Sequence, residues 1–161
     1  MNYHNITKDD MLNGDGLRVV LWVSGCSHHC KDCHNPQTWN PSSGIEFDEN
    51  AKQEIFDELD KDYISGITFS GGDPLMPCNR ECISSLIEQI HENYPQKTIW
   101  LYTGYDFEEI KNLPYLKNID VLCDGKFCIE KKDATTPWVG STNQRIIDVK
   151  KSLSTGNICL H

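Results

Sequence analysis

Apolar and polar residues alternate along the chain in blocks that predict strands and helices in turn. Residues 17–24 (LRVVLWVS) form a continuous apolar run rich in β-branched side chains, which is typical of a strand buried on both faces. Shorter runs of the same kind predict further strands at residues 66–70, 98–103, 119–123 and 145–149.

The segments between these runs have the period of helices. Asp48 is a suitable N-cap, and Ala51, Ile55 and Leu59 then recur every four residues along one helix face. A second helix is expected over residues 80–94, and a short one near residues 107–113. Strands that alternate with helices predict an α/β fold with a mostly parallel sheet, and neither a linker nor a repeat divides the chain.

Three unusual segments follow predicted strands directly. A cysteine-rich loop follows the first strand, Gly71-Gly72-Asp73 follows the second, and Thr103-Gly104-Tyr105 follows the third. Ligands of open parallel sheets bind beyond the carboxyl ends of the strands. The three segments are therefore expected to meet at one site.

Composition and charge narrow the class of partner. The 161 residues carry a formal net charge of −9 and contain no dense basic run, which argues against binding to nucleic acid. No apolar run approaches the length of a membrane span, and the polar N-terminus does not resemble a signal peptide. We expect a cytoplasmic protein with no membrane association, acting on a protein partner or a small substrate.

Three of the eight cysteines are closely spaced. Cys26, Cys30 and Cys33 form a C-x3-C-x2-C motif, and without an export signal such cysteines favour metal binding over disulfides. Three thiolates suit a 4Fe–4S cluster that keeps one iron free for a chelating substrate. The alternative is a zinc-stabilised interaction module, whose fourth ligand would be one of the histidines 28, 29 and 34.

The C-x3-C-x2-C spacing resembles the signature of the radical S-adenosylmethionine (SAM) superfamily. Gly71-Gly72-Asp73-Pro74 resembles the superfamily's "GGE" loop, with Asp73 where many relatives carry Glu. The resemblance implies that Cys26, Cys30 and Cys33 hold one 4Fe–4S cluster. It also implies that Gly71, Gly72 and Asp73 contact the methionine amino group of SAM.

Further segments resemble one group within that superfamily, the activating proteins of anaerobic (class III) ribonucleotide reductases. They are residues 13–16 (NGDG), 70–75 (SGGDPL), 100–105 (WLYTGY), 120–126 (DVLCDGK) and 140–148 (GSTNQRIID). The resemblance implies a single-domain truncated open (β/α) barrel over residues 1–149, with residues 150–161 as a tail. It also implies a radical SAM enzyme that installs a glycyl radical in a reductase partner, with flavodoxin or ferredoxin as electron donor and no catalytic residue beyond the cluster and SAM. The alternative within the superfamily is an activase of another glycyl-radical enzyme.

The residues that flank Cys33 depart from the usual pattern of the superfamily. Asp32 stands where many members carry an aromatic residue, and His34 stands where this group often has Tyr; both are expected at the cofactor.

Asp15, Thr103 and Tyr105 are candidates for lining the pocket, and residues 126 and 143–145 are candidates for meeting SAM or the reductase. The other cysteines, at positions 78, 82, 123, 128 and 159, have no assigned role, and a second cluster among them is an unfavoured alternative.

Overall fold

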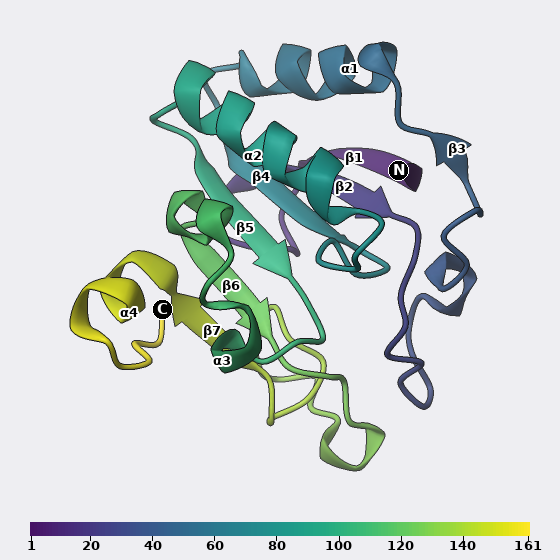
Figure 1. The fold of residues 1–161 in the computed structure, drawn as a ribbon, viewed down its shortest axis with the longest axis vertical. Helices are drawn as coiled ribbons and strands as arrows, with labels where there is room; N and C mark the ends of the chain where they lie inside the picture. The colour runs from purple at the N-terminus through teal and green to yellow at the C-terminus, as the bar shows by residue number, and fades with distance from the viewer.

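The computed structural model describes all residues 1–161, with a seven-stranded sheet at its centre (Figure 1). The elements in chain order are β1 (Asn2–Asp10), β2 (Leu17–Val23), η1 (Pro36–Thr38), β3 (Ile45–Glu46), α1 (Glu49–Leu59), β4 (Ile64–Gly71), α2 (Arg80–Asn93), β5 (Thr98–Tyr102), α3 (Phe107–Ile110), η2 (Pro114–Asn118), β6 (Val121–Asp124), η3 (Ile129–Lys131), β7 (Arg145–Asp148) and α4 (Val149–Thr155). The strand order is β3-β1-β2-β4-β5-β6-β7. The four central strands are parallel, and β1, β3 and β7 are antiparallel to their neighbours. The predicted α/β class and mostly parallel sheet are confirmed.

The two faces of the sheet differ sharply, because successive side chains of a strand point to opposite sides. On one face, 26 buried residues form the main core, and α1 and α2 lie along it (Figure 1). Leu101 of β5 belongs to this core, whereas its neighbour Trp100 points to the opposite face. There Trp100 packs in a cluster of four buried residues with Val121, Cys123 and Val139.

Local sequence explains where α1 begins and which face it buries. Asp48 has an extended backbone, and its side chain accepts a hydrogen bond from the backbone N–H of Ala51 at 2.9 Å, as an N-cap does. Ala51, Ile55 and Leu59 are buried, which confirms the predicted apolar face.

None of the four α-helices combines the length and the hydropathy that a membrane span requires.

The two ends of the chain add elements that the apolar pattern does not predict. β1 pairs with β2 as an edge hairpin, although only Tyr3 and Ile6 of β1 are buried. After β7, the chain forms α4 and then returns, so that Leu160 pairs with Ile147. Residues 150–161 therefore pack against the same sheet as the rest of the chain.

Candidate functional site

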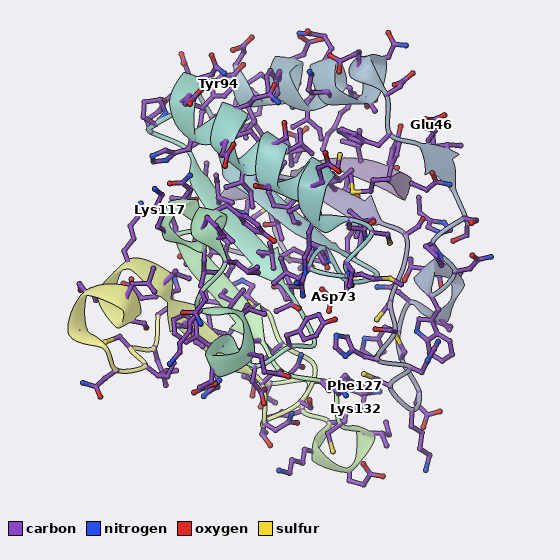
Figure 2. The ribbon with its side chains drawn as sticks, in the orientation of Figure 1. Glu46, Asp73, Tyr94, Lys117, Phe127 and Lys132 are labelled. Carbon is purple, nitrogen blue, oxygen red and sulfur yellow. The ribbon has the colours of Figure 1, made fainter.

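One cavity of about 190 Å³ lies at the carboxyl ends of the parallel strands. It brings together the loops that follow β2, β4, β5 and β6, and so confirms that the three predicted segments meet. In Figure 2, Asp73 and Phe127, which come from two of these loops, lie at this end of the strands. The lining residues are Cys26, His28, Cys30, Cys33, His34, Asn35, Thr38, Trp39, Ser70, Gly71, Gly72, Asp73, Tyr102, Thr103, Gly104, Gly125, Phe127 and Gln144.

The thiols of Cys26, Cys30 and Cys33 all line this cavity, and each is half-buried. Burial raises the pKa of the Cys26 and Cys30 thiols, and the backbone N–H groups of His28 and Phe127, respectively, offset part of that rise. The sulfur of Cys33 accepts a hydrogen bond from the backbone N–H of Asn35 at 3.4 Å. Each sulfur thus has a backbone donor nearby, an arrangement that stabilises thiolates and tunes the potential of iron–sulfur clusters.

The three cysteines are the thiols of this cavity that could hold a metal centre. A mononuclear zinc site needs its ligands around one atom, whereas a 4Fe–4S cluster takes one thiolate at each of several irons. The three sulfurs around one cavity are therefore suited to a cluster. Of the three histidines that could add a fourth zinc ligand, His28 has its Nε2 engaged by Asp73.

The glycine loop lies directly against the start of the cysteine loop. The N–H of Gly72 donates to the carbonyl of Val23, and the N–H of Asp73 donates to the carbonyl of Gly25, both at 2.7 Å. Gly71 has a φ of +105°, and a Cβ on Gly72 would lie 2.5 Å from the carbonyl oxygen of Gly25. Both positions therefore require glycine, because any side chain would push the two loops apart.

The carboxylate of Asp73 is buried and accepts hydrogen bonds from its own protein. The hydroxyl of Thr103 lies 2.9 Å from both carboxylate oxygens, and the backbone N–H groups of Gly104 and Leu75 donate at 3.0 and 2.8 Å. The imidazole Nε2 of His28 lies 2.6 Å from Oδ2. Asp73 therefore joins the glycine loop, the loop after β5 and the cysteine loop.

The two residues that flank Cys33 differ in their position relative to the cavity. His34 lines the cavity, with its ring 5.3 Å from the ring of Phe127. Asp32 is exposed at a turn with a φ of +56° and does not line the cavity. The ring of Tyr105 packs edge-on against His28 at 4.7 Å, just outside the cavity.

Asp15 lies at the opposite end of the sheet, where its carboxylate is 2.8 Å from Nε2 of His161. It therefore does not line the pocket of the cysteines.

Of residues 126 and 143–145, only Gln144 lines the cavity. Its side-chain oxygen accepts from the N–H groups of Gly140 and Ser141, and its amide nitrogen donates to the carbonyl of Gly125. Arg145 instead pairs with two carboxylates of its own chain, those of Asp124 and Glu108. These polar groups are thus engaged within the fold.

The other five cysteines lie outside the cavity. Cys123 is buried on the face opposite the main core, and burial raises the pKa of its thiol to about 12. Cys78 is exposed, and Cys82, Cys128 and Cys159 are half-buried. These five cysteines therefore share no site with the three at the cavity.

Several lining residues were not predicted from the sequence. Trp39 and Thr38 follow the cysteine loop, and Phe127 arrives from beyond β6. Tyr102 ends β5 beside Thr103 and contributes to the same wall. The only signal for them is their position close to a cysteine or to the end of a strand, which does not indicate the direction of a side chain.

Comparisons with known proteins agree with this chemistry. Residues 12–147 match the family model described as a 4Fe-4S single cluster domain. The chain is 50% identical over 147 residues to the anaerobic ribonucleoside-triphosphate reductase-activating protein of Enterobacteria phage T4, covering 91% of this chain and 93% of that one. It is 42% identical over 153 residues to the protein of that name from Haemophilus influenzae, covering 91% and 97%. For the one from Escherichia coli K12 the identity is 41% over 148 residues, covering 89% and 96%.

Proposed function

The chain belongs to the family of anaerobic ribonucleoside-triphosphate reductase-activating proteins, and we propose that it activates such a reductase by installing a glycyl radical in it. The observation that carries the proposal is the shared cavity of Cys26, Cys30 and Cys33 beside the glycine loop. A resident cluster with one open iron, next to a backbone that approaches a ligand closely, is what reductive cleavage of SAM requires.

In this proposal, Cys26, Cys30 and Cys33 hold one 4Fe–4S cluster. The chemistry that the bound cluster supplies is the transfer of one electron to the sulfonium of SAM, which breaks the C5′–S bond and yields methionine and the radical that takes hydrogen from a glycine. The N–H groups beside the three sulfurs help to set the reduction potential. The chain itself contributes ligands, position and exclusion of water, and no further side chain takes part in the reaction.

SAM binds in the same cavity, where the backbone of Gly71 and Gly72 faces the cysteines. Two glycines let the chain approach the methionine part of SAM without a side chain in between. His34 and Phe127 provide rings on the far wall, where an adenine can stack. Asp32 has no place in this arrangement, since its exposed side chain lies outside the cavity.

The finer architecture that we propose is a truncated open (β/α) barrel of the radical SAM type. The helices α1 and α2 cover one face of the sheet, as barrel helices do, and the other face carries the small cluster around Trp100. The loops from the carboxyl ends of four parallel strands line the cavity, as in barrel enzymes.

The partner is an anaerobic ribonucleotide reductase whose C-terminal glycine loses the hydrogen atom, and the electron comes from a donor such as flavodoxin or ferredoxin. The net charge of −9 suits a basic contact surface on one of these two proteins. The relatives carry the reductase in their name, which supports this partner over another glycyl-radical enzyme.

The test begins with anaerobic reconstitution with iron and sulfide, followed by EPR of the reduced protein with and without SAM. We expect a 4Fe–4S signal that SAM shifts, and release of methionine and 5′-deoxyadenosine. Cys30→Ala is expected to abolish SAM cleavage, whereas Cys159→Ala, at a half-buried cysteine outside the cavity, is expected to retain it. A Cys30→Ala protein that still cleaves SAM would overturn the ligand assignment.

A second arm tests the partner. The reduced protein and SAM are mixed with an anaerobic ribonucleotide reductase or with a different glycyl-radical enzyme, and the glycyl radical is recorded by EPR. A radical on the reductase alone supports the proposal. A radical on the other enzyme alone assigns the chain to a different partner.

A further inference from the structure

The cysteine loop is tied to the rest of the site by one buried side-chain contact, between His28 and Asp73. Nε2 of His28 lies 2.6 Å from Oδ2 of Asp73, and the side chains are 8% and 2% exposed. A carboxylate only accepts hydrogen bonds, so the imidazole donates through Nε2. Charge-assisted bonds of this length are among the stronger ones in proteins, particularly away from water.

Further contacts fix the side chains of both His28 and Asp73. The Asp73 carboxylate also accepts from Thr103, Gly104 and Leu75, which fixes its orientation. The ring of Tyr105 packs edge-on against His28, and the guanidinium of Arg80 lies 5.6 Å from the centre of the Tyr105 ring. The imidazole therefore sits between a fixed carboxylate and an aromatic wall.

Gly104 leaves space for this contact. A Cβ at Gly104 would lie 2.4 Å from Cδ2 and 2.7 Å from Nε2 of His28, closer than any real contact. The φ of Gly104 is not in the left-handed region, so its backbone does not call for glycine, and the steric demand comes from the imidazole. The loop after β5 is thus shaped around the histidine.

His28 lies between two of the cysteines. It is two residues from Cys26 and two from Cys30, so its anchoring restricts where both sulfurs lie. We propose that His28 and Asp73 are a positioning pair, in which Asp73 acts through His28 to hold the cysteine loop against the glycine loop, and that the Asp73 carboxylate does not bind the amino group of SAM. The proposal rests on the proposed function for the identity of the cluster and of SAM.

This assigns the Asp73 carboxylate a role different from the one that the family resemblance implies. A carboxylate with two oxygens offers about four acceptor positions, and four protein donors already occupy them: His28, Leu75, Thr103 and Gly104. An ammonium group could reach Asp73 only by displacing one of these donors. The backbone of Gly71 and Gly72, which lines the cavity, can meet SAM without such an exchange.

The test compares His28→Ala, His28→Gln and Asp73→Asn with the unchanged protein. Gln places an amide N–H near the position of Nε2 and is expected to rescue the contact. His91→Ala is the control, because His91 is an exposed histidine in the last turn of α2, outside the cavity.

The first readout is iron retained per chain after reconstitution and gel filtration against a chelator. His28→Ala and Asp73→Asn are each expected to weaken iron retention about tenfold or more, the usual effect of losing an outer hydrogen bond at a metal site. Their reduced EPR spectra without SAM should change in the same way, while His28→Gln and His91→Ala resemble the unchanged protein. Unchanged iron retention in His28→Ala would overturn the proposal.

The second readout separates the two roles of Asp73. SAM affinity is titrated by the EPR shift in His28→Ala, Asp73→Asn and the double variant. If Asp73 acts through His28, the double variant binds SAM no more weakly than the weaker single variant. If the Asp73 carboxylate binds SAM directly, Asp73→Asn lowers the affinity further in the His28→Ala background, and the proposal fails.

The third readout needs neither cluster nor SAM. Hydrogen exchange in the metal-free full chain is expected to be faster over residues 26–33 and at Gly104 in His28→Ala, and unchanged in His28→Gln. Equal exchange in His28→Ala and the unchanged protein would overturn the pair even if the cluster forms. Conversely, an unchanged protein that binds no cluster would refute the proposed function and leave this readout intact.

Discussion

Arg18 of β2 is expected to stabilise the fold although its charge is buried, and its replacement by methionine tests this. Arg18 is fully buried on the sheet face opposite α1 and α2. All five of its N–H groups donate, to the hydroxyls of Thr68 and Thr98 and to the carbonyls of Asp15, Ile67 and Thr98, at 2.7–2.9 Å. Its guanidinium also lies 5.3 Å from the centre of the Trp100 ring.

The magnitude follows from two opposing effects. Five satisfied hydrogen bonds contribute about 1 kcal/mol each, and the acceptors would be left buried without this donor in the variant. Against this, burial lowers the pKa of Arg18 from 12.5 to about 10, so keeping the charge costs about 3 kcal/mol. Since methionine preserves much of the apolar stem, we expect Arg18→Met to lose a net of about 2 kcal/mol, or roughly 4–8 °C in melting temperature.

The assay is urea unfolding of the metal-free, reduced protein, followed by circular dichroism. Lys150→Met is the control, because Lys150 is exposed and its ion pair with Asp120 is a surface contact, worth about 0–1 kcal/mol. The reasoning is refuted if Arg18→Met is as stable as Lys150→Met, since the five bonds would then contribute nothing beyond the cost of burying the charge.

Two further substitutions test the site and the loop after β6. Gly104→Ala should displace the His28 ring and weaken iron retention about tenfold, as His28→Ala does; normal retention would show that the loop can yield. Arg145→Met should cost about 3–5 kcal/mol in urea unfolding, because it leaves the buried Asp124 carboxylate without its cation, and a loss below about 1 kcal/mol would contradict this. Arg145 also holds the pKa of Glu108 below its ordinary 4.5, so this contribution is present above pH 4.5 and is lost as the pH falls below it. Stability measured against pH should therefore fall less steeply below 4.5 in Arg145→Met, and an unchanged slope would exclude the pair as its cause.

The central strands and the two long helices could be predicted because their signals are local. The run at 17–24 corresponds to β2, and the capping residue Asp48 together with a four-residue apolar period marks α1. Burial on both faces makes a strand apolar throughout, and burial of one face gives a helix its period. These signals do not depend on which element lies next to them in space.

The strands β1 and β3 at one side of the sheet could not be predicted in this way, since they bury little of their surface. In β1 only Tyr3 and Ile6 are buried, so the segment reads as a polar terminus. β3 is only two residues long, and both are exposed. Edge strands of this kind are recognised by the partner they pair with, and pairing is a property of the fold rather than of the segment.

In the candidate site, the cysteine motif could be predicted from the sequence, whereas the contacts of Asp73 could not. The cysteine spacing predicts a common site for three sulfurs because eight residues of loop can bring them together without help from distant chain. The role of Asp73 depends instead on His28, 45 positions earlier, and on Gly104, 31 positions later. A motif records which residue types recur, and a glycine loop ending in a carboxylate is equally compatible with a carboxylate that faces a ligand and with one that faces the protein. We infer the second from the number of donors that surround the Asp73 carboxylate, and these donors come from segments that only the folded sheet brings together.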